Sequence, residues 1–273
     1  MKKIILQIAL CSTIIIIALT GCTTNPVTGR KELNTVSSDD EMKLGLTSFD
    51  QMKKEVPISK DANANAMVQR VGKRIAEVAG KDMPNAQWEF VVFDSKEANA
   101  FCLPGGKVGV YTGLLPIAKD DSGLATVLGH EIGHAVSHHG AERMSQAQLL
   151  QVGGQAVGSL TSNSSQITQT AVAAVYGLGG KLGYELPHSR AQESEADKIG
   201  LIYMTRAGYA PEQALAFWQR FAAYNNANGG SKTPGFLSTH PLDDVRIKQI
   251  QEWIPEVKAQ STGSTLGSQV IGK

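Results

Sequence analysis

The sequence predicts an α+β fold that is mainly helical and includes a small β-sheet. Of the 273 residues, 42% are hydrophobic and 19% are charged, so the chain can bury one sizeable core. Apolar residues recur at helical spacing through most of the chain, whereas three short stretches near its middle are rich in β-branched and aromatic residues. We therefore expect one globular domain with tails, in which several helices surround a small sheet.

Helices are predicted before and after that sheet along the chain. Ser38 or Asp39 can cap a helix that continues through Phe49, and the apolar period of residues 61–79 is closed by Gly80. Residues 147–183 are rich in small and amide side chains and are interrupted at 162–165, which predicts two helices flanking a mobile segment, either a lid or a surface connection. Further helices are expected at 122–137, 191–207, 210–221 and 245–253.

The sheet is expected to contain three short strands. Residues 88–93 form the first, and the turn Pro104-Gly105-Gly106 joins a second strand at 100–103 to a third at 107–112. Two successive glycines allow the close approach of these two strands.

The stretch His130-Glu131-Ile132-Gly133-His134 lies in the predicted helix 122–137. Residues four apart on a helix differ by about 40° around its axis, so both imidazoles project from one face and can bind one metal ion. Two neutral histidines and the adjacent glutamate form the HExxH pattern of zinc peptidases, in which the glutamate takes a proton from water. The alternative is a helix whose two histidines are surface or core residues without a metal. The apolar stripe of this segment argues against that alternative, because it indicates a buried helix.

A third metal ligand is available in Glu193-Ser194-Glu195-Ala196-Asp197. Glu193 and Asp197 share one face of a predicted helix, which suits one carboxylate that binds zinc and another that hydrogen-bonds a ligand histidine. Glu195 points away from Asp197, because two residues along a helix turn by about 200°. We therefore expect Glu193 to be the ligand, Asp197 to support a ligand histidine, and Glu195 to be solvated.

Five segments occur in the order found in the HtpX/Oma1-like zinc metallopeptidases of gluzincin type, which the chain resembles from about Asn25 to Arg246. The segments are residues 99–106, 110–114, 130–134, 193–197 and 239–241. The resemblance implies a zincin-like metalloprotease domain with one zinc ion per chain. Asn25-Pro-Val-Thr-Gly-Arg30 is similar to the bacterial lipoprotein branch, but the sequence shows no counterpart of the several membrane spans of the HtpX members.

By the same resemblance, the strand beside the zinc helix takes up the substrate backbone in extended form and so adds a strand to the sheet. The expected groove residues are Asn99, Ala100, Gly105, Gly106, Val108, Gly109 and Val110. The alternative for this stretch is a plain hairpin without a ligand role.

The resemblance also places His240 near the zinc ion, and several roles are open to it. Its imidazole can stabilise the oxyanion of the tetrahedral intermediate, so that it is catalytic together with Glu131. It can instead bind the metal directly in a resting state, or it can be a structural loop residue. His138, His139 and His188 are expected to be structural.

The N-terminal residues predict export and lipidation. Lys2 and Lys3 precede an apolar run at 4–19, which is too short to favour a membrane span over a signal peptide. The run ends in Leu19-Thr-Gly-Cys22, which is similar to a bacterial lipobox, so Cys22 is expected to carry the lipid; an ordinary signal peptide or anchor helix is the alternative. We expect a lipoprotein signal peptide at 1–21, a lipidated tether and packing helix at 22–60, the catalytic domain at 61–257 and a flexible tail at 258–273.

Charge and cysteine content restrict the partners. Removal of residues 1–21 takes away two lysines and leaves 24 basic against 25 acidic residues, so nothing favours nucleic acid. Cys11 would leave with the signal peptide and Cys22 would be acylated, so Cys102 lacks an intramolecular disulfide partner. Thr23 replaces the Asp that, in the familiar enterobacterial sorting rule, retains a lipoprotein at the inner membrane. The expected location is therefore the outer membrane, facing the periplasm.

The function predicted from these residues is zinc-dependent hydrolysis of peptide bonds in proteins of the bacterial cell envelope, as part of protein quality control. Zinc would polarise the scissile carbonyl, and Glu131 would take a proton from water and later deliver it to the leaving amine. The expected partners are protein or peptide substrates and envelope assembly factors. The alternatives are a zinc-bound, chaperone-like lipoprotein with an occluded cleft and a scaffold without proteolytic activity.

Overall fold

The computed structural model describes residues 22–180, 186–227, 236, 240–241 and 244–267. The chain divides into two compact units rather than the single domain expected. Residues 1–41 and 138–192 make up the hairpin unit, and residues 42–137 and 193–273 make up the sheet unit. The division arises because the segment between the two expected metal-binding helices forms helices of its own.

The sheet unit contains a three-stranded sheet in the order β3-β5-β4. β3 (Glu89–Phe93) is parallel to the central β5 (Lys107–Tyr111), and β4 (Ala100–Leu103) is antiparallel to β5. Gly105 and Gly106 turn β4 into β5 with φ values of 82° and 78°, a conformation that glycine adopts without strain. The three predicted strands are confirmed.

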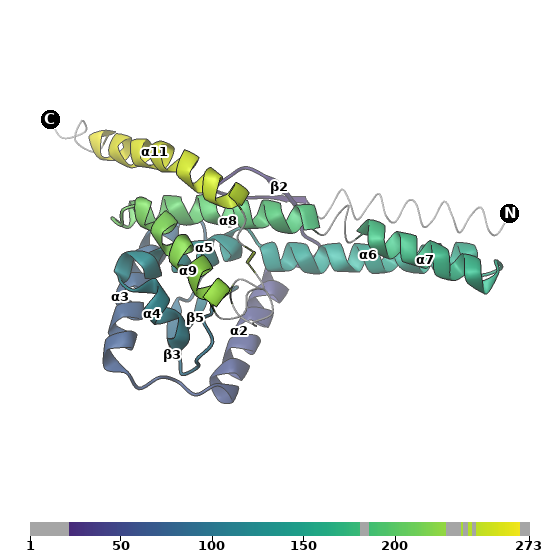
Figure 1. Cartoon of the computed structure of the whole chain (residues 1–273), viewed down its shortest axis with the longest axis horizontal. Coiled ribbons are helices and arrows are strands. Elements are labelled where there is room, and N and C mark those ends of the chain that lie inside the picture. Colours follow the sequence, from purple (N-terminus) through teal and green to yellow (C-terminus); the bar gives the residue numbers. More distant parts are fainter. Residues whose placement is uncertain (1–21, 181–185, 228–235, 237–239, 242–243, 268–273) are drawn as a thin grey trace. The chain divides into compact units, whose positions relative to one another are not determined.

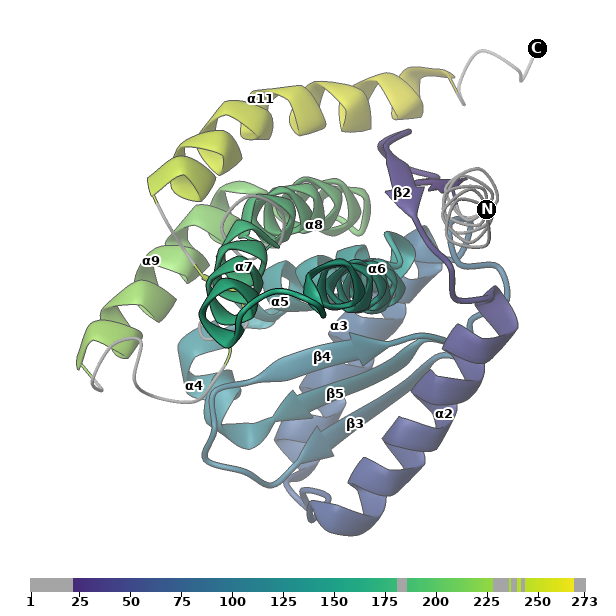
Figure 2. The same ribbon diagram turned by 90° about the vertical axis from the view of Figure 1, so that its right-hand side faces the viewer.

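Helices α2 (Ser38–Glu55) and α3 (Ala62–Ala79) flank this sheet, α2 beside β3 and α3 behind the strands (Figure 2). Ser37, and neither of the two residues predicted, caps α2: its hydroxyl accepts the N–H of Asp40. Gly80 follows α3 with φ −59°, so this helix ends without the left-handed glycine that often closes a helix.

The remaining helices of the sheet unit carry the histidines, carboxylates and aromatic residues of interest. A 3₁₀ turn (Thr112–Leu114) and α4 (Leu115–Ala118) lead into α5 (Asp121–Val136), whose first turn is capped by Asp120. The residues of α8 (Leu186–Arg206) from Glu193 onward belong to this unit, as do α9 (Glu212–Ala227) and α11 (Asp244–Gly267) (Figure 1).

Helix α11 corrects the prediction of a flexible tail from residue 258. It continues to Gly267. At the point where the tail was expected to begin, Val257 is buried and Lys258 pairs with Glu212 of α9. Residues 268–273 lie outside the part of the chain that the structure describes.

The hairpin unit begins with two short antiparallel strands, β1 (Cys22–Thr24) and β2 (Lys31–Leu33), where a polar tether was expected. Asn25 organises the turn between them, because its side-chain oxygen accepts the N–H groups of Val27 and Thr28. Helices α6 (His139–Thr161) and α7 (Gln166–Gly180) lie side by side in Figure 1 and confirm the two predicted helices.

The predicted signal peptide and the Cys22 side chain lie outside the described residues. Among the helices that the structure describes, none has both the length and the apolar content required to cross a bilayer.

Candidate metal centre

Helices α5 and α8 approach each other closely because small residues face each other where they meet. A Cβ atom added to Gly129 would lie 2.9 Å from the carbonyl oxygen of Gly200, and one added to Gly133 would lie 3.0 Å from that of Ala196. In a close-packed interior, larger residues at these positions would push the helices apart. The close approach brings the acidic face of α8 to the histidine face of α5.

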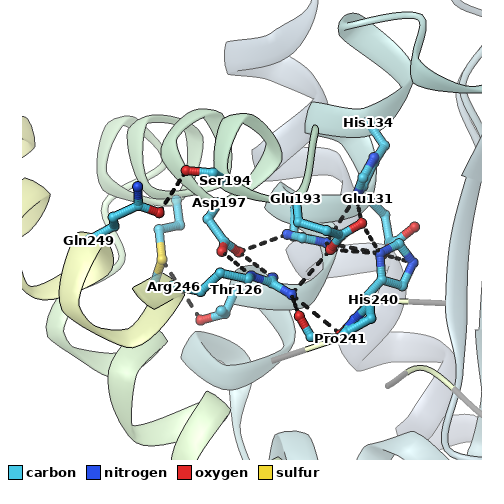
Figure 3. Close-up of polar contacts among 12 residues, drawn as sticks. Thr126, Glu131, His134, Glu193, Ser194, Asp197, His240, Pro241, Arg246 and Gln249 are labelled. Carbon is cyan, nitrogen blue, oxygen red and sulfur yellow. Dashed lines mark hydrogen bonds and ion pairs between the residues drawn. The ribbon is translucent and has the colours of Figure 1, made fainter. Parts of the chain in front are cut away.

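Four buried side chains, those of His130, His134, Glu193 and His240, each place one potential ligand atom within 4.8 Å of the others. The Nε2 atoms of the two α5 histidines are 3.1 Å apart, and they lie 3.4 Å and 3.3 Å from the Glu193 carboxylate oxygens. Nδ1 of His240 is 3.0 Å from Oε1 of Glu193 and 3.3 Å from Nε2 of His130. Figure 3 shows Glu193, His134 and His240 converging.

These distances fit a tetrahedral zinc ion. When nitrogen and oxygen ligands lie about 2.0–2.1 Å from zinc, tetrahedral geometry places the ligand atoms about 3.3–3.4 Å from one another. The electrostatics agree with the geometry: burial lowers the pKa of His130, but Asp197 and Glu193 raise it to about 9 overall. Burial likewise raises the pKa of Glu193, but its hydrogen bonds with the histidines lower it far below the usual value. The cluster therefore favours a bound positive charge.

Asp197 of α8 fixes the orientation of His130. Its Oδ1 accepts the Nδ1 hydrogen of His130 at 2.9 Å, so a metal ion that displaced the Nε2 proton would find the lone pair of Nε2 directed at the cluster. Arg246 of α11 donates two hydrogen bonds to the same carboxylate, of 2.7 Å and 2.9 Å (Figure 3). Burial raises the pKa of Asp197, but Arg246 and His130 hold it below its usual value, so this carboxylate stays ionised.

Arg246 also reaches the other parts of the cluster. It lies 3.2 Å from Oε2 of Glu193, and it donates to the carbonyl oxygens of His240 and Pro241. From the sequence, Arg246 was noted only as the last residue of the region that resembles the family, and its contacts with Asp197 and Glu193 were not predicted. The signal that could have found it is the buried Asp197, because a buried carboxylate that orients a neutral histidine needs a cation as a second partner.

Aromatic rings surround the histidines, and they were not predicted from the sequence either. The ring centroids of Trp218 and Phe236 lie 5.4 Å and 5.9 Å from that of His130, and Phe236 lies 4.5 Å from His240. The Arg246 guanidinium lies 4.8 Å from the centroid of Trp218. These rings exclude water from one side of the cluster and thereby strengthen its charge interactions.

Glu131 is buried beside His240. Its Oε1 is 3.5 Å from Nε2 of His240, whereas Nδ1 of the same ring contacts Glu193 and His130. Cys102 of the neighbouring strand β4 is close enough for the Glu131 charge to add to the effect of burial in raising the pKa of the thiol. The predicted metal and catalytic residues are therefore together in the sheet unit.

Other residues singled out in the sequence lie elsewhere or differ from expectation. His138 cannot continue the histidine face, because α5 ends at Val136 and His138 has φ 46°; its Nδ1 bonds Glu41 at 2.7 Å. His139 is buried outside the cluster. Glu195, expected to be solvated, is in fact buried, although it does not belong to the cluster either. The side chain of His188 lies outside the described residues.

The expected substrate groove needs a correction. β5 is the central strand and is paired on both sides, so a peptide cannot add to the backbone of Val108, Gly109 or Val110. Gly105 and Gly106 lie in the turn that precedes it. Asn99 and Ala100 remain candidates, because they lead into β4, an edge strand of this sheet that packs against α5.

Comparison with known proteins identifies the family of this arrangement. The chain is 36% identical over 245 residues to the mitochondrial metalloendopeptidase OMA1 of Schizosaccharomyces pombe, an alignment that covers 86% of this chain and 67% of the relative. Human OMA1, a mitochondrial metalloendopeptidase, is 32% identical over 243 residues, with 85% and 46% covered. The beta-barrel assembly-enhancing protease of Yersinia pestis is 31% identical over 241 residues, with 85% and 47% covered. The chain thus spans about half the length of the last two relatives.

The model of peptidase family M48 matches residues 62–254, a range that includes the described metal cluster and its supporting residues. The predicted resemblance to Oma1-like zinc metallopeptidases is confirmed by the match to this family and by its OMA1 relatives. The chain belongs to peptidase family M48 and is a zinc metalloendopeptidase.

Proposed function

We propose that the chain holds one zinc ion through His130, His134 and Glu193 and uses it to hydrolyse peptide bonds in proteins of the bacterial cell envelope. The observation that carries the proposal is the convergence of these three ligand atoms at separations of 3.1–3.4 Å. When bound, zinc supplies the Lewis acidity that polarises a scissile carbonyl and makes a neighbouring water acidic.

The chain's own residues supply the remaining chemistry. Glu131, on the same helix as the two histidines, accepts a proton from water and delivers it to the leaving amine. Asp197 keeps His130 in the tautomer that can bind a metal, and Arg246 keeps Asp197 ionised. The surrounding Trp218 and Phe236 rings keep this proton transfer away from bulk water on their side.

The substrate backbone adds to the sheet along β4. The carbonyl oxygen of Asn99 points toward β5 and accepts the N–H of Tyr111. In an antiparallel pair, alternate residues bond the neighbouring strand, so the backbone groups of Ala100 and Cys102 point away from β5, toward the free edge of the sheet. A peptide paired with that edge would run beside α5, whose residues include Glu131.

His240 acts as a resting-state ligand rather than as an oxyanion donor. Its Nδ1 lies among the metal-ligand atoms and its Nε2 lies 3.5 Å from Oε1 of Glu131, so its ring takes up space beside both groups. A water molecule activated by Glu131 would need that space, so His240 must leave before the reaction. His240 lies between α9 and α11 in the chain, and Arg246 donates hydrogen bonds to the carbonyl oxygens of His240 and Pro241.

The envelope location rests on the N-terminal sequence. Residues 1–21 would be the lipoprotein signal peptide, and the acylated Cys22 would anchor the chain to the outer membrane, facing the periplasm. The relative from Yersinia pestis is a beta-barrel assembly-enhancing protease by name, which supports quality control of envelope proteins and contact with assembly factors. An unmodified Cys22 at the mature N-terminus, found by mass spectrometry, would contradict the anchor.

Two glutamates on the same helix provide the test of the metal site. We expect Glu193→Ala to lose zinc and casein digestion together, whereas Glu195→Ala should retain zinc, because its carboxylate lies outside the cluster. Zinc content measured by atomic absorption on both variants decides the assignment, which fails if Glu195→Ala alone loses the metal. Wild-type protein that binds zinc but digests no casein would favour a chaperone-like or scaffold lipoprotein.

The role of His240 is tested by His240→Ala. We expect zinc to be retained and casein digestion to rise, because the imidazole no longer fills the space beside Glu131. A fall in kcat of about 10²–10³ with KM little changed would instead show that His240 is an oxyanion donor.

A further inference from the structure

The helical hairpin α6–α7 differs from the rest of the chain in its charge. No Asp, Glu, Lys, Arg or His occurs between Arg143 and Lys181, although 19% of the whole chain is charged. A solvated helical surface is normally rich in charged residues. The composition of the hairpin therefore indicates that part of its surface contacts something other than water.

Large apolar side chains stand out from this uncharged surface. Ile167, Ala171, Val175 and Leu178 follow one another at helical spacing on α7, and all four are exposed. Ile167 is 84% exposed and Val175 is 71% exposed, while Leu160, at the end of α6, is 73% exposed. These residues form an apolar stripe that runs along α7 as far as the turn that joins it to α6.

The two helices are held together without using this stripe. Tyr176 of α7 donates a hydrogen bond to the carbonyl oxygen of Leu150. Its ring packs over Gly153 and Gly154, and a Cβ atom on Gly153 would collide with the tyrosine hydroxyl. The exposed stripe is therefore free for a partner.

Several polar side chains of the hairpin form hydrogen bonds within it. The hydroxyls of Ser159, Thr161 and Thr170 donate to backbone carbonyl oxygens one turn earlier, although Ser159 and Thr170 are exposed. At the tip, the Gln169 amide donates to the carbonyl oxygens of Ser162 and Ser164. Internal bonds of this kind reduce the cost of leaving water, because a polar group that enters hydrocarbon unpaired costs several kcal/mol.

From the absence of charge, the exposed stripe and the internal satisfaction of polar groups, we infer that the α6–α7 hairpin inserts its tip and the outer face of α7 into the surface of a lipid bilayer. The 15 residues of α7 span about 22 Å, less than the hydrocarbon thickness, so the hairpin lies in the interface and does not cross. Insertion would use apolar contact alone, because residues 144–180 include no cation to attract anionic lipid.

A protein partner fits these observations less well than a bilayer does. Protein interfaces are rich in aromatic residues and arginine and carry a polar rim. The only aromatic residue between Arg143 and Lys181 is Tyr176, whose ring is used within the hairpin, and that stretch contains no arginine. The membrane-anchored N-terminus proposed above would bring the chain to such a surface, but the inference does not depend on that anchor, on zinc or on proteolysis.

The inference is tested by tryptophan fluorescence on the full protein mixed with phosphatidylcholine vesicles that carry brominated acyl chains. Ile167→Trp places a reporter on the stripe, and Leu44→Trp, at a residue of α2 that is 51% exposed, is the matched control. After subtraction of the parent signal, we expect the tryptophan at position 167 to be blue-shifted and quenched. We expect the control to be unaffected, and high salt to change neither result.

A second pair of variants tests the role of charge. Val175→Glu in the Ile167→Trp protein should reduce the affinity for vesicles by about tenfold, because a carboxylate must then enter the interface. Val175→Thr keeps the shape and adds no charge, and it should retain the quenching.

Three outcomes would overturn the inference. The protein could associate with vesicles while the tryptophan at position 167 behaves like the one at position 44. That result would be compatible with binding through the lipid anchor and would show that the hairpin does not insert. The protein could fail to associate with vesicles at all. A blue shift at position 167 that appears without lipid and rises with protein concentration would identify a second copy of the chain as the occupant.

Discussion

Two arginine–carboxylate pairs, one in each unit, have a buried carboxylate that accepts two hydrogen bonds of similar length. In the sheet unit Arg246 donates to Asp197 at 2.7 Å and 2.9 Å, and in the hairpin unit Arg30 donates to Glu142 with two bonds of 2.9 Å. Burial raises the pKa of both carboxylates, but the hydrogen-bonding and charged partners of each together hold its pKa below the usual value.

The pairs differ in the third group that the carboxylate contacts. Asp197 also accepts a hydrogen bond from His130, whereas Glu142 accepts one from the Gln192 amide. In the first arrangement Arg246 fixes Asp197, which in turn orients the potential metal ligand His130. In the second, the pair joins the N-terminal strands to α6. The same pair of charges thus supports metal chemistry in one unit and the packing of a turn in the other.

The largest effect that should separate the two pairs is on folding stability. Arg246→Ala leaves Asp197 as an uncompensated buried charge, and we expect it to lower the free energy of unfolding by about 3–5 kcal/mol. Arg30→Ala should cost less, because the Arg30 side chain is 29% exposed and water can replace part of its interaction, whereas Arg246 is 4% exposed. Urea unfolding followed by circular dichroism measures both, and equal losses would contradict the comparison.

The next effect concerns the metal. Asp197→Asn keeps the shape of the side chain but loses the charge that holds His130, so zinc affinity should fall by about 10–100-fold. Glu142→Gln, the matched change in the other pair, should leave zinc affinity unchanged. Competition with a chromophoric chelator measures both affinities, and a similar fall in Glu142→Gln would show that the hairpin-unit pair also supports the metal site.

The smallest effect is on the pH dependence of stability. The pKa of Glu142 is lower in the folded chain than in the unfolded chain. The stability that its ionised form contributes is therefore fully present above the ordinary carboxyl pKa of about 4.3, and it is lost as the pH falls through the pKa of the folded state. Wild type should therefore exceed Glu142→Gln in stability by about 1–3 kcal/mol at pH 7, with a smaller difference at pH 4 and below. A difference that grows on acidification would have the wrong sign for this pair.

The sequence predicted those parts of the site that depend on helical spacing. The faces shared by His130 and His134, and by Glu193 and Asp197, follow from residues four apart, so helical periodicity alone was enough to place both pairs. The three strands were predictable because β-branched and aromatic runs are short and the Gly105-Gly106 turn allows little else.

What the sequence did not predict depends on contacts between distant segments. Trp218 and Arg246 reach the cluster because α9 and α11 pack where they do, and Phe236 reaches it from the segment between those helices. Local periodicity in the sequence does not predict such packing. The central position of β5 has the same origin, because strand order is a property of the sheet as a whole. Glu195 was expected in solvent because only its own helix was considered, whereas its burial is set by neighbouring elements.

The most direct test of the proposed mechanism is Glu131→Gln, assayed for zinc content and for casein digestion on the same preparation. The amide cannot accept a proton from water, while the side chains of His130, His134 and Glu193 are unchanged, so we expect about one zinc per chain and no detectable digestion. Full digestion by this variant with zinc still bound would contradict the role of Glu131 and, with it, the proposed mechanism.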